Sequence, residues 1–178
     1  MKYIIGLGNP SKKYKNTRHN IGQDTVFKLI NSLDGDFLTL NKTQLINPEC
    51  YMNGSGLALK KLFKNVKPDS DNENILIIHD DLDQPIGKMK MIYGGNSGGH
   101  NGIKSVHSNM KIKNFYRLKV GISPQIKVDK DKAPDFVLGK FTPDEKEIMK
   151  KLYPKILEGI KLFMEGEVDR AVEVVNRK

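Results

Sequence analysis

The segment Ile75-Leu76-Ile77-Ile78 constrains the fold more than any other part of this chain. Four consecutive aliphatic residues, with no polar residue between them, are typical of a strand that is covered on both faces of a sheet. Such strands occur in α/β proteins, where helices pack on the two faces. A second apolar run at residues 2–7, ended by glycine and proline, predicts another buried strand of the same kind.

The rest of the chain alternates between the periods of strands and helices. Further strands are expected at residues 88–93 and 115–122, with one or two weak strands at 38–46, and helices at 21–33, 53–63, 100–108, 142–164 and 168–176. Asn53 is expected to cap the second of these helices, and Thr142 with Glu145 forms a capping box for the fourth. Polar, turn-rich loops are expected at 65–74 and 123–134. We therefore predict a single α/β domain over residues 1–178, with a mixed, mostly parallel central β-sheet and helices on both faces.

The balance of charge is strongly basic. Thirty Lys and Arg against 21 Asp and Glu give a formal net charge of +9. This charge attracts polyanions such as nucleic acid, but an excess of lysine also occurs for solubility alone.

No apolar run is long enough to span a membrane, and Met1-Lys2-Tyr3 leads directly into the first strand without a secretory leader. The only cysteine, Cys50, is expected to be a free buried thiol. We expect a soluble, monomeric, cytoplasmic protein.

His19 and Asp80 are the candidates for acid–base chemistry. His19 lies in a polar stretch, where a solvated surface histidine is the alternative, and Asp80 follows the buried strand at 75–78. A histidine base works best when a carboxylate holds one ring nitrogen and so fixes the tautomer. Ligands of open α/β sheets bind beyond the carboxyl ends of the strands, so these two residues are expected to meet in one cleft.

Three asparagines, Asn9, Asn53 and Asn101, stand beside glycines. Asparagine next to glycine is common turn chemistry, but carboxamides also bind peptide main chains and stabilise an oxyanion. Two further groups of residues are candidates for binding. An apolar or stacking surface is expected from Tyr14, Tyr51 and Met52, with ordinary packing as the alternative. A basic rim for phosphates is expected from Lys90, Arg117 and Lys119, with simple solvent exposure as the alternative.

The sequence gives only weak support to two further hypotheses, a dinucleotide cofactor and a divalent metal ion. Gly6-Leu7-Gly8 begins like a dinucleotide fingerprint, but Ser11 stands where its third glycine would fall. The run from His79 to Asp83 contains three carboxylates, which suit magnesium or manganese, yet no paired metal motif or second acidic run accompanies it. We expect neither a metal nor a cofactor.

Together these motifs resemble the bacterial-type peptidyl-tRNA hydrolases over nearly the whole chain. The matching blocks are Gly-Leu-Gly-Asn-Pro at 6–10, Tyr14, Thr-Arg-His-Asn at 17–20, Tyr-Met-Asn-Gly-Ser-Gly at 51–56, His-Asp-Asp-Leu-Asp at 79–83, Gly-Gly-His-Asn-Gly at 98–102, Arg-Leu-Lys-Val-Gly-Ile at 117–122 and Phe-Val-Leu-Gly-Lys-Phe at 136–141. The resemblance implies cleavage of the ester between a peptide and the terminal ribose of tRNA, without a metal or cofactor. The rival hypothesis is an RNA-binding relative that keeps the fold without turnover.

The resemblance also implies roles for individual residues. His19 is the general base and Asp80 orients it. Asn9 and Asn53 line the peptide-binding cleft and hold the reacting carbonyl, while Asn101 positions the water and a mobile loop. Asn20 and His100 join the substrate-binding residues.

The sequence departs from the family pattern at two places. A Lys and an Arg of the family clamp the 5′-phosphate of tRNA, whereas Ile92 and Lys119 stand at those positions here, and Lys90 is expected to replace the missing lysine. A lysine gives a point charge in place of a bidentate fork, so discrimination at this phosphate is expected to be weaker. The stretch before Tyr51 is also short for the family, which predicts a trimmed hairpin at the sheet edge.

Overall fold

A five-stranded sheet forms the centre of the structure, a computed structural model that describes residues 1–33, 35–64, 72–124 and 128–177. The strands are β1 (Lys2–Gly6), β2 (Thr43–Ile46), β3 (Asn72–Pro85), β4 (Met89–Tyr93) and β5 (Phe115–Ser123), in the spatial order β2-β1-β3-β5-β4. All neighbours are parallel except β4, which pairs antiparallel with β5. The predicted mixed, mostly parallel sheet is confirmed.

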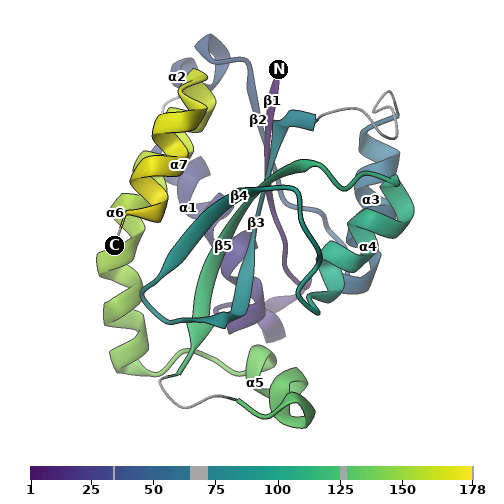
Figure 1. Cartoon of the computed structure of the whole chain (residues 1–178), viewed down its shortest axis with the longest axis vertical. Helices are drawn as coiled ribbons and strands as arrows, with labels where there is room; N and C mark the ends of the chain where they lie inside the picture. The colour runs from purple at the N-terminus through teal and green to yellow at the C-terminus, as the bar shows by residue number, and fades with distance from the viewer. Residues whose placement is uncertain (34, 65–71, 125–127, 178) are drawn as a thin grey trace.

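Helices cover both faces of this sheet (Figure 1). Helices α1 (Ile21–Ser32), α6 (Pro143–Glu165) and α7 (Val168–Asn176) pack on one face, and α3 (Ser55–Leu62) and α4 (Asn101–Met110) pack on the other. Alternate side chains of β3 enter the two cores, Leu76 and Ile78 the first, Ile75 and Ile77 the second. Each such buried aliphatic side chain contributes about 1.5–3 kcal/mol relative to its exposed state, so the run at 75–78 stabilises both layers at once.

Two glycines allow unusually close approach between elements. A Cβ at Gly22 would lie 2.1 Å from the backbone oxygen of Ile78, and one at Gly56 would lie 1.9 Å from the backbone oxygen of Ser105. Neither distance is tolerable for a real side chain. The first contact brings α1 close to β3, and the second brings α3 close to α4.

The expectation of one or two strands at residues 38–46 is only partly right. Helix α2 (Gly35–Leu40) comes first, and β2 follows it. Side-chain donors stabilise this short helix, because the Thr39 hydroxyl donates to the Gly35 carbonyl and the Asn41 amide donates to the Phe37 carbonyl. Tertiary packing also contributes, since Phe37 and Leu38 lie against the larger core. A six-residue helix offers too little periodicity for detection in sequence.

The predicted cap at Asn53 is wrong. The 3₁₀ turn η3 (Met52–Gly54) precedes α3, and Gly54 occupies the cap position without a side-chain bond. The turn closes by a bond from the Gly54 amide to the Tyr51 carbonyl, and the Ser55 hydroxyl donates to the Met52 carbonyl. By contrast, the capping box of Thr142 and Glu145 at the start of α6 is confirmed.

The remaining elements are short: η1 (Lys12–Tyr14), η2 (Arg18–Asn20), η4 (Lys130–Lys132) and α5 (Ala133–Leu138). Helix α5 was not expected from the sequence. Most of the predicted loop at 65–74, and residues 125–127 of the loop at 123–134, lie outside the described residues. Within the described part of the chain, none of the helices has the length and apolar character needed to cross a membrane.

Candidate active site

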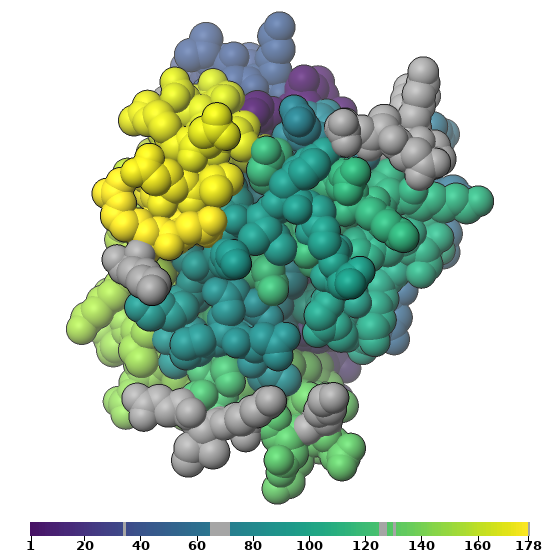
Figure 2. All heavy atoms as spheres, viewed as in Figure 1, coloured from purple at the N-terminus to yellow at the C-terminus, as the bar shows by residue number. Residues whose placement is uncertain are grey.

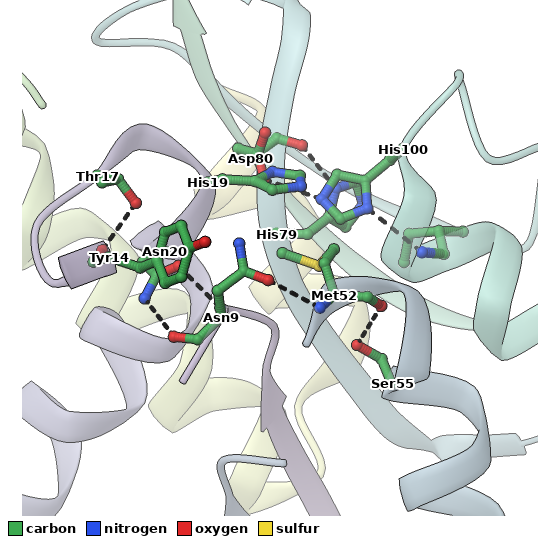
Figure 3. A network of polar contacts seen from close by, with 11 residues as sticks. Asn9, Tyr14, Thr17, His19, Asn20, Met52, Ser55, His79, Asp80 and His100 are labelled. Atoms are coloured by element: carbon green, nitrogen blue, oxygen red, sulfur yellow. Dashed lines mark hydrogen bonds and ion pairs between the residues drawn. The ribbon is translucent and has the colours of Figure 1, made fainter. Parts of the chain in front are cut away.

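The site forms where β3 continues beyond the end of β1. The last pair between these strands joins Gly6 to Ile78, whereas β3 runs on to Pro85 alongside β5. His79 and Asp80 therefore have no β1 neighbour, and the chain that follows β1 folds over them. Figure 3 shows this segment and the turn η2 bringing Asn9, His19 and Asn20 toward Asp80.

His19 and Asp80 form a buried hydrogen-bonded pair. His19 Nδ1 lies 2.8 Å from Asp80 Oδ1, and both side chains are buried. Burial opposes the ionisation of Asp80, but His100 and His19 outweigh it and hold the pKa of the carboxyl well below its usual value. An ionised carboxylate only accepts hydrogen bonds, so Nδ1 of His19 carries the proton and Nε2 keeps a lone pair. This is the tautomer that a general base requires.

His100 contacts the same carboxylate oxygen. Its Nε2 lies 2.9 Å from Asp80 Oδ1, and its Nδ1 accepts from the Ile103 amide as the N-cap of α4. Because Nδ1 is an acceptor, the proton of the neutral ring is on Nε2 and is donated to Asp80. Helix α4 is thereby tied to the Asp80 carboxylate by one imidazole.

His79 is a third imidazole in this group. Its ring centroid lies 4.7 Å from that of His100, and its Nδ1 donates to the Asp80 carbonyl oxygen over 2.7 Å. Burial, together with the neighbouring His100, holds the pKa of His79 well below its usual value, so the ring is neutral at pH 7. Its Nε2 is buried without a hydrogen-bond partner in the structure.

Asn9 is held on two sides. Its backbone amide donates to Asn20 Oδ1 (2.8 Å), and Asn20 Nδ2 donates back to the Asn9 carbonyl (2.9 Å) and to Gln23 Oε1 (3.0 Å). The Met52 amide donates to Asn9 Oδ1 over 2.8 Å. A backbone N–H is a donor only, so this bond fixes which way the carboxamide faces. The Asn9 Nδ2 group is directed toward the imidazoles, as Figure 3 shows.

The other predicted peptide-binding residues surround this core of the site. Tyr14 and Tyr51 form an edge-to-face pair with ring centroids 6.3 Å apart, and Tyr51 is 63% exposed. Met52 is buried beside Asn9. Asn53 and Asn101 are exposed, at η3 and at the first residue of α4, and are not part of the buried network.

Two of the three residues of the predicted basic rim lie side by side on adjacent strands, and their binding of phosphate stays a prediction. Lys90 is exposed and is the registered neighbour of Lys119 across β4 and β5, while Lys119 Nζ lies 2.8 Å from Asp81 Oδ2. Arg117, in contrast, is buried, and its guanidinium donates to the carbonyls of Gly94 and Asn96. The expectation that Arg117 belongs to an exposed rim is wrong, because this arginine is used to hold the loop before α4.

The described residues offer one potential metal-binding group, formed by His19, Asp80 and His100, whose donor atoms lie within 4.8 Å of one another. In the structure these atoms are already paired, because Asp80 Oδ1 accepts both imidazole protons. A cation there would displace the tautomer that leaves His19 Nε2 basic. The chemistry of the donor set therefore fits a hydrogen-bonded base better than a resident metal.

Sequence reasoning missed several residues of the site. Gln23 and Asp81 orient Asn20 and Lys119, and His79 supports the backbone of Asp80. The spacing of Asn20 and Gln23 across the start of α1 was a usable signal, whereas the pair of Asp81 and Lys119 joins distant parts of the chain. Cys50 is free, as predicted, but half-buried, and burial raises the pKa of its thiol, which disfavours a nucleophile.

Comparison with known proteins gives a consistent result. Residues 3–178 match the family model described as "Peptidyl-tRNA hydrolase". A peptidyl-tRNA hydrolase of Clostridium botulinum (strain Alaska E43 / Type E3) is 35% identical over 189 residues, covering 99% of this chain and 96% of the relative. One from Fervidobacterium nodosum is 39% identical, covering 97% and 94%.

Solved structures agree with the sequence matches. The crystal structure of peptidyl-tRNA hydrolase from Acinetobacter baumannii superimposes with a TM-score of 0.83 at 31% identity, covering 99% of this chain and 95% of that one. A complex of a peptidyl-tRNA hydrolase with N-propanol gives a TM-score of 0.82 at 30% identity, with the same coverage. The likeness thus extends over the sheet, both helical layers and the segments that form the site.

Proposed function

Because the chain belongs to the peptidyl-tRNA hydrolase family and is a hydrolase, we propose that it splits the ester between a peptide and the 3′-terminal ribose of tRNA with His19 as general base. The observation that carries this mechanism is the bond between His19 Nδ1 and Asp80 Oδ1, 2.8 Å long, which leaves Nε2 as a free acceptor. Such a nitrogen is suited to remove a proton from water at neutral pH.

The reaction begins when His19 Nε2 accepts a proton from a water molecule that attacks the ester carbonyl. Asp80 stays ionised and stabilises the imidazolium as it forms, because its pKa is held low. Collapse of the tetrahedral intermediate breaks the bond to the ribose oxygen. The imidazolium returns its proton to that oxygen, which frees the tRNA and a peptide with a new carboxylate. No metal or cofactor takes part in these steps.

Asn9 is the group best placed to stabilise the oxyanion. Its Oδ1 is held by the Met52 amide, so Nδ2 presents N–H donors toward the imidazoles without a cost of reorientation. Asn53 and Asn101 are exposed at the margin of the site. We assign to them the binding of the peptide main chain and of the attacking water, with Asn20 and His100 holding Asn9 and Asp80 in place.

The tRNA is bound through its phosphates in this proposal. Lys119 and Lys90 are registered neighbours on β5 and β4, which places two cationic side chains on adjacent strands. Asp81 already pairs with Lys119, so a phosphate must compete with this carboxylate.

We also propose that the protein acts as a monomeric single domain in the cytoplasm, where its substrate arises during translation.

A release assay tests substrate, reaction and metal independence together. Purified protein is incubated with an N-acetylated aminoacyl-tRNA in the presence of a chelator, with the unblocked aminoacyl-tRNA as matched control. The proposal predicts release of free tRNA from the blocked substrate and little from the control, because the asparagines recognise the peptide amide. Binding of the blocked substrate without release would favour the rival RNA-binding relative. Loss of activity in chelator would contradict the metal-free mechanism.

A further inference from the structure

Arg18 links the catalytic turn η2 to a distant part of the chain, residues 136–145. We propose that Arg18 is a positioning residue that fixes His19 for catalysis by pairing with Glu145. Arg18 directly precedes His19, and its guanidinium contacts Phe136 of α5 and Glu145 at the start of α6, so we place it in the protein framework and not on the substrate. The inference rests on the proposed role of His19.

The ion pair is short and largely shielded from water. Arg18 Nη2 lies 2.6 Å from Glu145 Oε2, with only 8% and 14% of the two side chains exposed. The guanidinium also lies 4.2 Å from the centroid of the Phe136 ring and 5.5 Å from that of Phe141. A planar cation that contacts two aromatic rings and a carboxylate is geometrically defined, unlike the exposed ion pairs of Arg170 and Arg177.

Backbone contacts add to this link. The Arg18 amide donates to the Gly139 carbonyl over 3.0 Å, and Thr17 forms an antiparallel bridge with Lys140. A Cβ at Gly139 would lie 3.0 Å from Arg18 Nη1, so this position is tight as well. The residues that precede His19 are therefore paired with residues 139–140 by both backbone and side chain.

His19 lies between two fixed neighbours. Arg18 is held by the contacts just described, and Asn20 is held by Asn9 and Gln23. The turn η2 has only three residues, so movement of Arg18 moves the imidazole relative to Asp80. Misplacement of a catalytic group by about 1 Å can lower the rate by about 100-fold, which makes the Arg18–Glu145 pair a determinant of kcat.

Two variants at the start of α6 separate positioning from simple stability. Glu145 Oε2 also accepts from the Thr142 amide in the capping box, over 2.8 Å. Glu145→Gln keeps an acceptor for this bond but removes the charge that pairs with Arg18. Thr142→Ala removes the hydroxyl of the capping box and leaves the ion pair. Both are expected to lower the stability of α6, but only the first changes the partner of Arg18.

The expected result is a fall in kcat of about 10-fold or more for Glu145→Gln with KM within about twofold, whereas Thr142→Ala keeps kcat within about twofold. Arg18→Ala should lose more activity and regain part of it when free guanidinium is added, since a guanidinium-sized space beside Glu145 is then open. Equal kcat for Glu145→Gln and Thr142→Ala would overturn the proposal, even if Arg18→Ala fails to fold.

A spectroscopic measurement makes the outcome independent of turnover. The Nδ1 proton of His19, assigned by its loss in His19→Ala, is expected to shift or broaden in the proton NMR spectrum of Glu145→Gln and to remain unchanged in Thr142→Ala. An unchanged resonance in both variants would contradict the positioning role. Full activity of His19→Ala would instead contradict the proposed function, so the two failures are distinguishable.

Discussion

At the scale of single residues, the site depends on the directions that a few hydrogen bonds impose. The Met52 amide orients the carboxamide of Asn9, and Asp80 selects the tautomer of His19. Both bonds join two groups of the protein itself, so neither needs substrate in order to form. Preorganisation of this kind lowers the cost of stabilising charge in the transition state.

Substitution of Asn9 tests this preorganisation. Asn9→Asp keeps an acceptor for the Met52 amide but replaces the N–H donors by negative charge, so kcat is expected to fall by about 10²–10³-fold with a small change in KM. Asn41→Asp is the matched control, because it makes the same change in an asparagine outside the site, where Asn41 Nδ2 donates to the Phe37 carbonyl at the end of α2. Steady-state rates on a blocked aminoacyl-tRNA measure both. A rate for Asn9→Asp near that of the control would remove Asn9 from the oxyanion site.

At the scale of elements, the strands and long helices could be predicted because their patterns are local. The aliphatic run at 75–78 is a continuous pattern in sequence, although its side chains pack in both layers, and the capping box at Thr142 joins residues only three positions apart. Helix α2 and helix α5 are too short for a periodic signal. The burial of Arg117 was also unpredictable, since its partners Gly94 and Asn96 belong to a loop more than twenty residues earlier.

Helix α1 contains a carboxyl group whose ionisation opposes folding. Burial raises the pKa of Asp24 to about 6, against the opposing effects of the Asn16 backbone, Lys28 and Lys15. Its unfolded pKa is about 3.9. Between these values the folded state binds more protons than the unfolded state, so stability falls as pH rises through this window.

Asp24→Asn should therefore be more stable than the parent protein at pH 7, by roughly 1–2 kcal/mol after allowance for partial exposure, and about equal to it near pH 4. Denaturant unfolding at the two pH values measures the difference. Asp144→Asn, at an exposed position in the first turn of α6, is the control and should show no such gain at pH 7. A pH-independent effect of Asp24→Asn would show that the shift assigned to Asp24 is wrong.

At the scale of the whole molecule, basic side chains gather beside the sheet edge. A groove of about 360 Å³ between β4 and the C-terminal helices has four cations among its lining residues, Lys88, Lys90, Lys155 and Arg177. Figure 2 shows α7 directly beside the segment that contains β3 and β4. Lys90 joins this groove to Lys119 on β5. These four cations therefore belong to the basic excess of the chain and lie near the proposed tRNA contacts.

Lys119→Ala tests the proposed phosphate contact. KM for the tRNA substrate should rise, the slope of log KM against log salt should flatten by about one unit, and kcat should stay nearly constant. Lys28→Ala on α1 removes the same charge from a lysine that lies over the Tyr153 ring of α6 and not on β4 or β5, and serves as control. A fall in kcat alone would place Lys119 in the chemistry instead of in binding.

The central claim is that His19 removes the proton from water while Asp80 holds its ring. His19→Gln tests it most directly, because the glutamine amide retains a donor for Asp80 but has no basic nitrogen. Single-turnover release of tRNA at saturating enzyme isolates the chemical step from binding. We predict a rate about 10³-fold below that of the parent protein. A rate equal to that of the parent protein would contradict the assignment of His19 as the base.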